Sequence, residues 1–232
     1  MCPGRFFVSW SGVLTLAYTG FSPALEGLKA RMQDGETVLP RENPGSKWPK
    51  TSLGCLRDGA RLTPQQLSVL SDICRELSEA ALGESMQETV FVDRLSIVLY
   101  GCRCLEHNRR LSMRTVAMAP AASPAECAAR PSEEERGRVA GVMSEMSSPD
   151  YWFHASKDGS RESHYRGPAL GLTLVHDISC FWDAQGGPGE GLGSAFWDAV
   201  RAFRARVDAE LPGMYTWFDE SSLHITVRAL MG

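Results

Sequence analysis

The sequence predicts an α+β fold of two lobes, and two observations lead to this expectation. Apolar strand-like runs alternate with amphipathic helical stretches along the chain. Each half also repeats one order of parts: a strand containing Leu-Thr-Leu, an amphipathic helix, an aromatic-bearing loop and a strand with an X-x-Ser/Thr step. With 232 residues, of which 43% are hydrophobic, the chain is long enough to bury a sizeable core.

The first half, residues 1–118, is expected to form the first lobe. Its strands are predicted at residues 13–19, 50–56, 89–101 and 111–118, and the last two should form an antiparallel hairpin with a polar turn near His107 and Asn108. A helix is expected where Leu25, Leu28 and Met32 recur at helical spacing. Another should begin at Thr63, since Pro64 and Gln66 complete a capping-box pattern.

The second half, residues 151–232, is expected to form the second lobe. Residues 119–150 are Ala/Pro/Ser-rich and then charged, which indicates a surface connection with at most one helix. Strands are predicted at 169–175 and 223–230, and residues 186–193 should be a flexible glycine-rich loop. A helix should bury Phe196, Val200, Phe203 and Val207 on one face.

Composition narrows the class of protein. A formal net charge of -4 removes the broad electrostatic attraction that duplex-DNA binders need. Seven cysteines without a dense framework favour a reducing compartment, so a cytoplasmic location is expected. The apolar run at residues 6–18 is interrupted by Ser9, Ser11 and Gly12 and is too short to cross a bilayer, and residues 13–19 are expected to be a strand, so neither a signal peptide nor a membrane segment is expected there.

The chemistry is concentrated in the last predicted strand. Residues two apart on a strand project from the same face, so His224 and Thr226 point together. An imidazole beside a hydroxyl suits a phosphate, because the ring exchanges a proton near neutral pH and the hydroxyl holds a non-bridging oxygen. The alternative is a half-buried strand whose histidine bonds to a neighbour.

The segment Leu-His-Ile-Thr-Val at 223–227 resembles the His-x-Thr/Ser motif of the two-histidine phosphoesterase superfamily, which includes RNA ligase and cyclic phosphodiesterase relatives. The resemblance implies two lobes, each an antiparallel sheet with helices on its outer face, and a cleft between them. It also implies two such motifs that open 2′,3′-cyclic phosphodiesters. One histidine activates water in that scheme, and the other protonates the leaving oxygen.

This chain departs from the family pattern in two respects. Lys50 occupies the position of the first histidine, while Ser52 keeps the hydroxyl, so the acid/base pair is broken. An ordinary lysine attracts phosphate but is a poor base at neutral pH. The order of parts differs as well, because strands follow the lysine motif and none follows the histidine motif. The expectation is therefore slow or absent hydrolysis, with a non-catalytic binding module or a purely structural domain as alternatives.

Further candidates surround these motifs. His164 and His176 are candidates for the missing proton-transfer partner, and Tyr165 and Arg166 lie in an aromatic-rich loop able to stack on a base and hold phosphate. The spacing of Cys102, Cys104 and His107 does not match common zinc sites, so neither a metal nor a cofactor is expected. The expected partner is a nucleotide or an RNA end with a phosphodiester, and the oligomeric state is left open.

Overall fold

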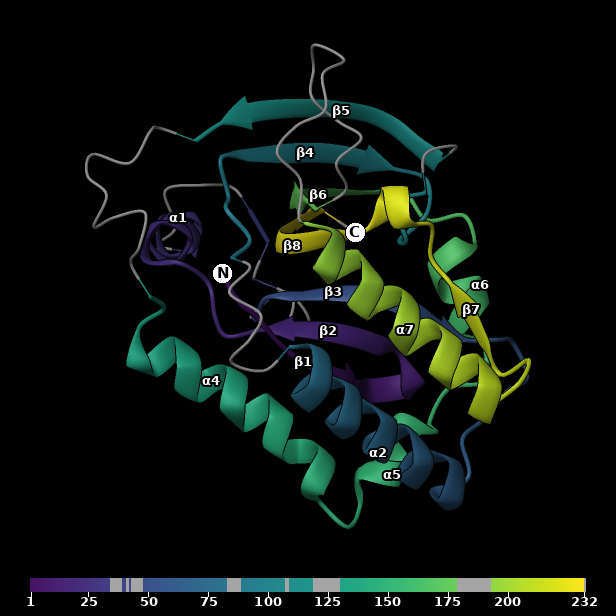
Figure 1. Cartoon of the computed structure of the whole chain (residues 1–232). Coiled ribbons are helices and arrows are strands. Elements are labelled where there is room, and N and C mark those ends of the chain that lie inside the picture. The colour runs from purple at the N-terminus through teal and green to yellow at the C-terminus, as the bar shows by residue number, and fades with distance from the viewer. Residues whose placement is uncertain are drawn as a thin grey trace.

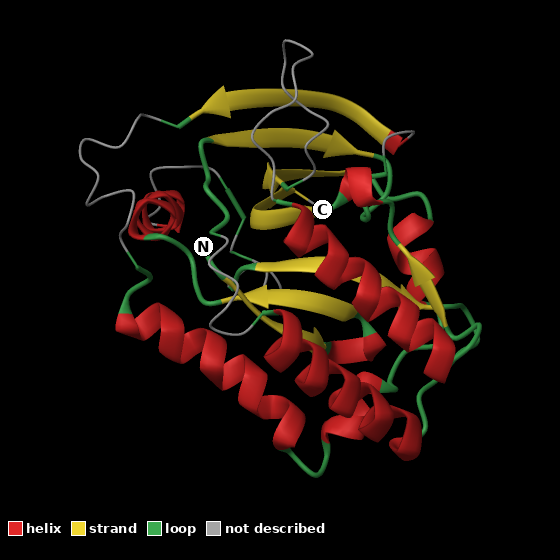
Figure 2. Ribbon diagram, in the orientation of Figure 1, coloured by secondary structure: helices red, strands yellow, loops and turns green. Residues whose placement is uncertain are grey.

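The computed structural model describes residues 1–33, 39–40, 42, 48–82, 89–106, 109–118, 130–178 and 193–231. These residues form two four-stranded antiparallel sheets with helices packed around them, which confirms the predicted α+β class (Figures 1 and 2). The glycine-rich segment 186–192, the turn at His107 and Asn108, and the first part of the predicted connection, 119–129, lie outside the described residues.

Sheet A has the strand order β1-β2-β3-β7. Its members are β1 (Pro3–Val8), β2 (Leu14–Tyr18), β3 (Lys50–Leu56) and the short β7 (Tyr215–Trp217). Every residue of β2 is buried, as its apolar sequence requires. The buried hydroxyl of Thr15 in β2 donates to the Phe7 carbonyl at 3.3 Å, which satisfies a group that water cannot reach.

Sheet B has the strand order β5-β4-β6-β8. Its members are β4 (Arg94–Tyr100), β5 (Arg110–Ala117), β6 (Gly171–Asp177) and β8 (His224–Met231). The pairing of β4 with β5 confirms the predicted antiparallel hairpin. The histidine strand β8 pairs with β6, which places residues of the two strands opposite one another in a defined register.

Each sheet contains strands from both halves of the chain. β4 and β5 precede residue 118 yet join β6 and β8, whereas β7 comes from the second half and pairs with β3. The sheets therefore do not follow the division expected at residues 119–150. That division was drawn from composition along the chain, which carries no information about pairing between distant strands.

Six α-helices are described. They are α1 (Pro23–Gln33), α2 (Pro64–Ala81), α4 (Glu133–Ser144), α5 (Tyr151–Ala155), α6 (Arg161–Arg166) and α7 (Ser194–Glu210). The predicted capping box begins α2: the Thr63 hydroxyl accepts from the Gln66 amide at 3.2 Å, and the Gln66 side chain accepts from the Thr63 amide at 2.9 Å. The single helix expected in the connection is α4.

The main core lies between the sheets and the helices α2 and α7, which run along the same side of the sheets (Figure 2). The predicted inward residues of α7 are buried, and Phe203 stacks on Phe6 of β1 with ring centroids 4.2 Å apart. This contact fixes a helix from the second half of the chain on a sheet begun by the first half. Burial of such aromatic pairs dominates core energetics.

Three features were not predicted. The N-terminal residues 3–8 form a strand of sheet A, β7 was not expected, and the stretch 151–166, interpreted as a polar loop, contains α5 and α6. Helices of five and six residues show too little periodicity to be recognised, and a three-residue strand cannot show alternation. Tertiary contacts hold these short elements in place.

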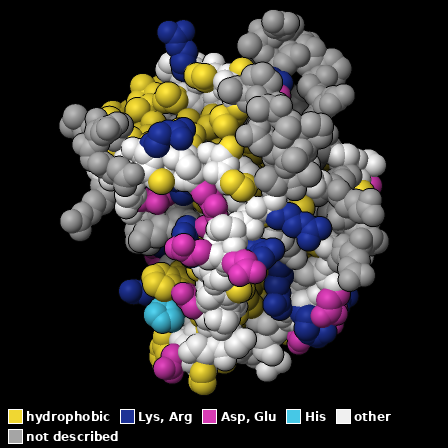
Figure 3. All heavy atoms as spheres, turned by 90° about the vertical axis from the view of Figure 1, so that its left-hand side faces the viewer, with side chains coloured by type: hydrophobic (Ala, Val, Ile, Leu, Met, Phe, Trp, Pro, Cys, Tyr) yellow, Lys and Arg dark blue, Asp and Glu magenta, His cyan; other side chains and the backbone are white. Residues whose placement is uncertain are grey.

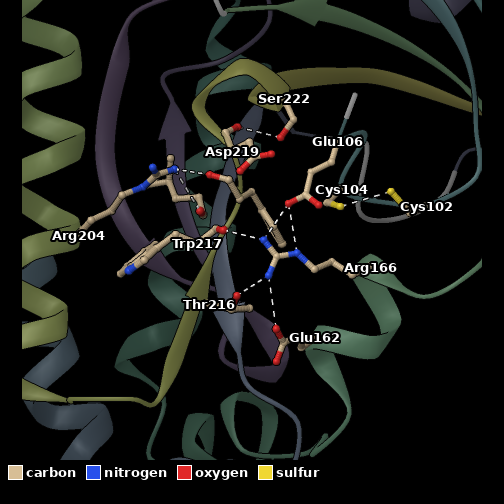
Figure 4. A network of polar contacts seen from close by, with 12 residues as sticks. Cys102, Cys104, Glu106, Glu162, Arg166, Arg204, Thr216, Trp217, Asp219 and Ser222 are labelled. Atoms are coloured by element: carbon tan, nitrogen blue, oxygen red, sulfur yellow. Dashed lines mark hydrogen bonds and ion pairs between the residues drawn. The ribbon is translucent and has the colours of Figure 1, made fainter. Parts of the chain in front are cut away.

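Arg166 of α6 ties the two sheets together (Figure 4). Its guanidinium donates to the Glu106 carboxylate at 2.8 Å, beside the turn that follows β4, and to the Trp217 carbonyl of β7 at 2.9 Å. It also donates to the Thr216 hydroxyl and forms an ion pair with Glu162 at 3.4 Å. One side chain thus connects sheet A, sheet B and α6, using the planar donor geometry that distinguishes arginine from lysine.

The closeness of β7 to β3 can be tested at Gly54. A Cβ atom there would lie 2.6 Å from the Trp217 ring and 2.7 Å from the Thr216 carbonyl oxygen. We expect Gly54→Ala to lower the free energy of unfolding by about 1–3 kcal/mol in urea titrations, because the backbone of β7 must move. Gly137→Ala, where nothing lies within 4 Å of the new Cβ on α4, should instead stabilise by about 0.5–1 kcal/mol. Equal stabilities of the Gly54 variant and the wild type would contradict the β3–β7 pairing.

The contribution of Arg166 can be measured in the same way. Arg166→Gln leaves the Glu106 carboxylate, only 15% exposed, without its cation, so we expect a loss of about 2–3 kcal/mol in the free energy of unfolding. The matched control is Arg206→Gln, whose exposed ion pair with Glu210 should be worth less than about 0.5 kcal/mol. Similar losses in both variants would show that the sheets do not depend on Arg166.

Candidate functional site

The two predicted motifs lie on neighbouring strands of different sheets. β3 and β8 run side by side with Cα atoms within 8 Å of each other, although they share no ladder of hydrogen bonds (Figure 1). Both strands begin with the same alternation: Lys50 and Ser52 are partly exposed on β3, as are His224 and Thr226 on β8, while the residues between and after them are buried. Each motif therefore has its two polar side chains on one face of its strand.

The hydrogen bond of His224 determines which ring nitrogen carries the proton. Its Nδ1 lies 2.8 Å from the carbonyl oxygen of Ser222, in the 3₁₀ turn Glu220–Ser222 that precedes β8. A carbonyl only accepts hydrogen bonds, so Nδ1 donates and the neutral ring keeps a lone pair on Nε2. Nε2 is the atom that can take a proton from water.

Two charged side chains act on His224. Asp177 is its direct cross-strand neighbour on β6, and Arg110 of β5 forms an ion pair with Asp177 at 3.3 Å. Burial lowers the pKa of the His224 imidazole below its ordinary value; the hydrogen bond to Ser222 and the Asp177 carboxylate act in the opposite direction, and Arg110 lowers the pKa further. The ring is consequently neutral at physiological pH and available as a base.

The ammonium of Lys50, at the start of β3, lies against an aromatic ring and is shielded from water. Its ammonium lies 4.3 Å from the centroid of the Trp48 ring, in cation–π contact. Burial lowers the pKa of Lys50 to about 8, with a smaller lowering from the Lys29 ammonium of α1. Lys50 is still largely charged at neutral pH, yet it loses its proton far more readily than a solvated lysine.

Ser52 is held by α6. Its hydroxyl forms a hydrogen bond with the phenol of Tyr165, which also packs against Phe218 with ring centroids 5.0 Å apart. Burial raises the pKa of Tyr165, so the phenol stays protonated at neutral pH and can donate to Ser52. The serine hydroxyl then has its own hydrogen to offer to a ligand. Tyr165 of α6 thus lies beside the lysine motif.

Thr226 lies opposite Val175 in the register of β6 and β8, on the same face of sheet B as Asp177 and His224. The next residue, Val227, accepts a hydrogen bond through its carbonyl from Lys29 at 2.6 Å. Lys29 therefore joins α1 to the histidine strand and also influences Lys50. This shared neighbour indicates that the Lys50 ammonium and the middle of β8 lie in one region.

The other three predicted residues are used differently. His176 lies opposite Ile225, on the other face of β6 from His224, is buried, and binds the Arg94 carbonyl through Nδ1 at 3.1 Å. His164 is exposed on α6. The guanidinium of Arg166 is occupied by its contacts with Glu106 and with the β7 backbone. Neither histidine is thus placed beside His224 as its missing partner, because the register of β6 and the direction of α6 turn them elsewhere.

Ser52 and His224 have different hydrogen-bond partners, the Tyr165 phenol for Ser52 and the Ser222 carbonyl for His224. The charges that act on His224 are those of Asp177 and Arg110, whereas the charge that acts on Lys50 is that of Lys29. Different charged groups thus shift the pKa values of Lys50 and His224, and a ligand that uses both motifs would have to span them.

Sequence reasoning missed Asp177, Arg110 and Lys29. Asp177 follows the predicted strand by two residues, and pairing that strand with 223–230 in the observed register would have placed it opposite His224. Arg110 and Lys29 carried no comparable signal, because their roles depend on a hairpin bulge and on helix docking. Spacing along one strand cannot reveal such neighbours.

Cys102 and Cys104, whose Sγ atoms lie 3.4 Å apart, are buried thiols near the Glu106–Arg166 ion pair (Figure 4). Among the described residues, no group of three or more His, Cys, Asp or Glu side chains has a geometry that could hold a metal ion. The side chains of the candidate site are one imidazole, two hydroxyls and a lysine ammonium.

The outer surface mixes charges of both signs. Figure 3 shows basic and acidic side chains interspersed on the side of the molecule that carries α1 and α4.

In the described ranges, no helix combines the length and the apolar character needed to cross a bilayer.

Comparisons with known proteins identify no relative for this chain: no family model, no curated protein and no solved structure matches it.

Proposed function

We propose that this protein recognises a nucleotide or an RNA end that carries a phosphodiester, with 2′,3′-cyclic phosphates as the favoured class, and hydrolyses it slowly. The observation that carries the proposal is the pairing of two X-x-Ser/Thr motifs on neighbouring strands, each with its polar pair partly exposed. Together they supply one cation, two hydroxyl donors and one basic imidazole nitrogen, the groups that bind and activate a phosphodiester.

In the proposed reaction, His224 is the general base. Its Nε2 takes a proton from water while the water oxygen bonds to phosphorus and the bond from phosphorus to one ribose oxygen breaks. The leaving oxygen takes a proton from the Lys50 ammonium, which with a pKa of about 8 is a better acid than an ordinary lysine. The hydroxyls of Ser52 and Thr226 hold the non-bridging oxygens.

The motifs also support an origin of the two sheets by duplication and an architecture of two lobes with the ligand between them. The motif strand β3 is an inner strand of sheet A, in the order β1-β2-β3-β7, whereas β8 is the last strand of sheet B, in the order β5-β4-β6-β8. In both sheets the motif strand pairs antiparallel with a strand containing Leu-Thr-Leu, and the buried threonines Thr15 and Thr173 each donate to a backbone carbonyl of an adjacent strand. These shared features are the grounds for relating the two sheets.

A second candidate function is a non-catalytic RNA, nucleotide or protein-binding module on the same fold. Lys50 favours it, because an ammonium holds phosphate without needing to exchange a proton. Loss of one general acid or base costs about two to four powers of ten in rate, so binding can persist where turnover has almost vanished. The two functions share one site and differ only in whether His224 moves a proton.

Turnover separates these candidates. Purified protein is assayed on a panel of nucleoside 2′,3′-cyclic phosphates, and His224→Ala should lower the rate by about two to four powers of ten because the general base is lost. Lys50→His should raise the rate, since an imidazole restores an acid that exchanges its proton near neutral pH. His154→Ala removes an exposed histidine of α5 and serves as the control, with an unchanged rate.

Absence of turnover in every variant, together with retained binding of the cyclic phosphates, would establish the binding module instead. Turnover that survives His224→Ala would contradict the base assigned here.

The pKa of Lys50 predicts how binding depends on pH. The ammonium is present below about pH 8 and is lost above it, so affinity for a nucleoside 2′,3′-cyclic phosphate should fall by about tenfold between pH 7 and pH 9 in calorimetric titrations. Lys50→Arg keeps its charge over this range and should show a flat profile. A wild-type affinity that does not change over this range would mean that the Lys50 ammonium does not contact the ligand.

A further inference from the structure

A buried ion pair lies beside His224. Arg110 and Asp177 are joined at 3.3 Å, and their side chains are only 7% and 10% exposed. Two charges are taken out of water here at a cost that their mutual attraction offsets only in part. Such a pair is weak evidence for stability, so its position next to a candidate catalytic group suggests another role.

The register of sheet B points Asp177 at His224. The two residues are direct partners between β6 and β8, so their side chains leave the sheet on the same face with Cβ atoms about 4.5–5.5 Å apart. One carboxylate oxygen, Oδ1, accepts from Arg110, while the buried Oδ2 has no hydrogen-bond partner among the residues that the structure describes. A carboxylate with an unused acceptor therefore stands next to the imidazole.

Arg110 is itself firmly held. Its Nε donates to the Leu105 carbonyl at 2.7 Å, in a turn where Leu105 adopts a left-handed conformation with φ of 56°, and Nη1 contacts the Met113 sulfur at 3.8 Å. The guanidinium thus has little freedom. It fixes the Asp177 carboxylate without reaching the Ser222 carbonyl that binds His224 on the other side.

We propose that Asp177 is the positioning residue of His224, stabilising the imidazolium that forms when Nε2 takes a proton, and that Arg110 holds Asp177 in place and limits this effect. The inference rests on the proposed function only in assigning the proton transfer to His224. The groups facing the ring are Asp177 from β6, Arg110 from β5 and the Ser222 carbonyl from the turn before β8.

The physical reason is the balance between burial and charge. Burial disfavours the imidazolium, and a carboxylate at cross-strand distance recovers part of that loss. Arg110 opposes it, since a second cation repels the protonated ring. The ring is thereby kept neutral at rest and still able to accept a proton, which is the requirement for a general base.

The experiment is a titration of isotopically labelled protein followed by long-range proton–nitrogen NMR of the histidine rings. In Asp177→Asn the midpoint of His224 should move to lower pH, and its neutral ring should keep the proton on Nδ1 because Ser222 is unchanged. Asp93→Asn is the matched control, because the Asp93 carboxylate raises the pKa of His176 and is not among the charges that act on His224. It should move only the His176 midpoint. An unchanged His224 midpoint in Asp177→Asn overturns the proposal.

A measurement on the wild type covers the case in which Asp177→Asn does not fold. The side-chain carboxyl carbon of Asp177 should show an inflection at the pH where His224 titrates, and a curve without that inflection also overturns the proposal. These readings need no substrate. If both NMR results are as expected while no cyclic phosphate is hydrolysed, the proposed function fails and the interaction of Asp177 with His224 stands. If turnover exists, the acidic limb of its pH profile should shift to lower pH in Asp177→Asn.

Discussion

The Arg166 guanidinium is the contact on which the relation between the sheets depends. It donates at once to Glu106, beside the turn of sheet B, and to the backbone of β7 in sheet A. β7 leads through a short 3₁₀ turn into β8, so fixing β7 also fixes where the histidine strand begins. The same helix carries Tyr165, which holds Ser52. A residue expected to bind phosphate therefore contributes by positioning both motifs.

A second constraint is the register between β6 and β8. Because side chains alternate, a slip of one residue would exchange the faces of every pair. In the observed register Asp177 is opposite His224, and His176 is turned to the far side opposite Ile225. The sequence-based choice of His176 as a partner was one residue away from the carboxylate that lies there. That difference separates a buried structural histidine from a charged neighbour of the site.

Local sequence patterns predicted the longer elements but not the tertiary partners of the site residues. Strands and helices with long periodic patterns were predicted closely: residues 50–56 form β3, and the helix capped by Thr63 begins at Pro64. Within the site, the shared face of His224 and Thr226 also follows from alternation alone. The partners of those residues do not, because Asp177, Arg110 and Lys29 reach them through strand pairing and helix docking. Local pattern determines which way a side chain points, and tertiary contacts determine what it meets.

The environment of Lys50 in the first motif has a consequence for the proposed function. An ordinary ammonium would bind phosphate and take no part in proton transfer. Burial, with a smaller contribution from the Lys29 ammonium, lowers the pKa of Lys50 to about 8, close enough to neutrality for the group to give up a proton. At the other motif, burial lowers the pKa of His224 and keeps the ring neutral, while the Asp177 carboxylate partly offsets this lowering. The pKa values of Lys50 and His224 are thus shifted so that one group is a cation that can act as an acid and the other is a neutral base, which is the division of roles that the proposed hydrolysis requires.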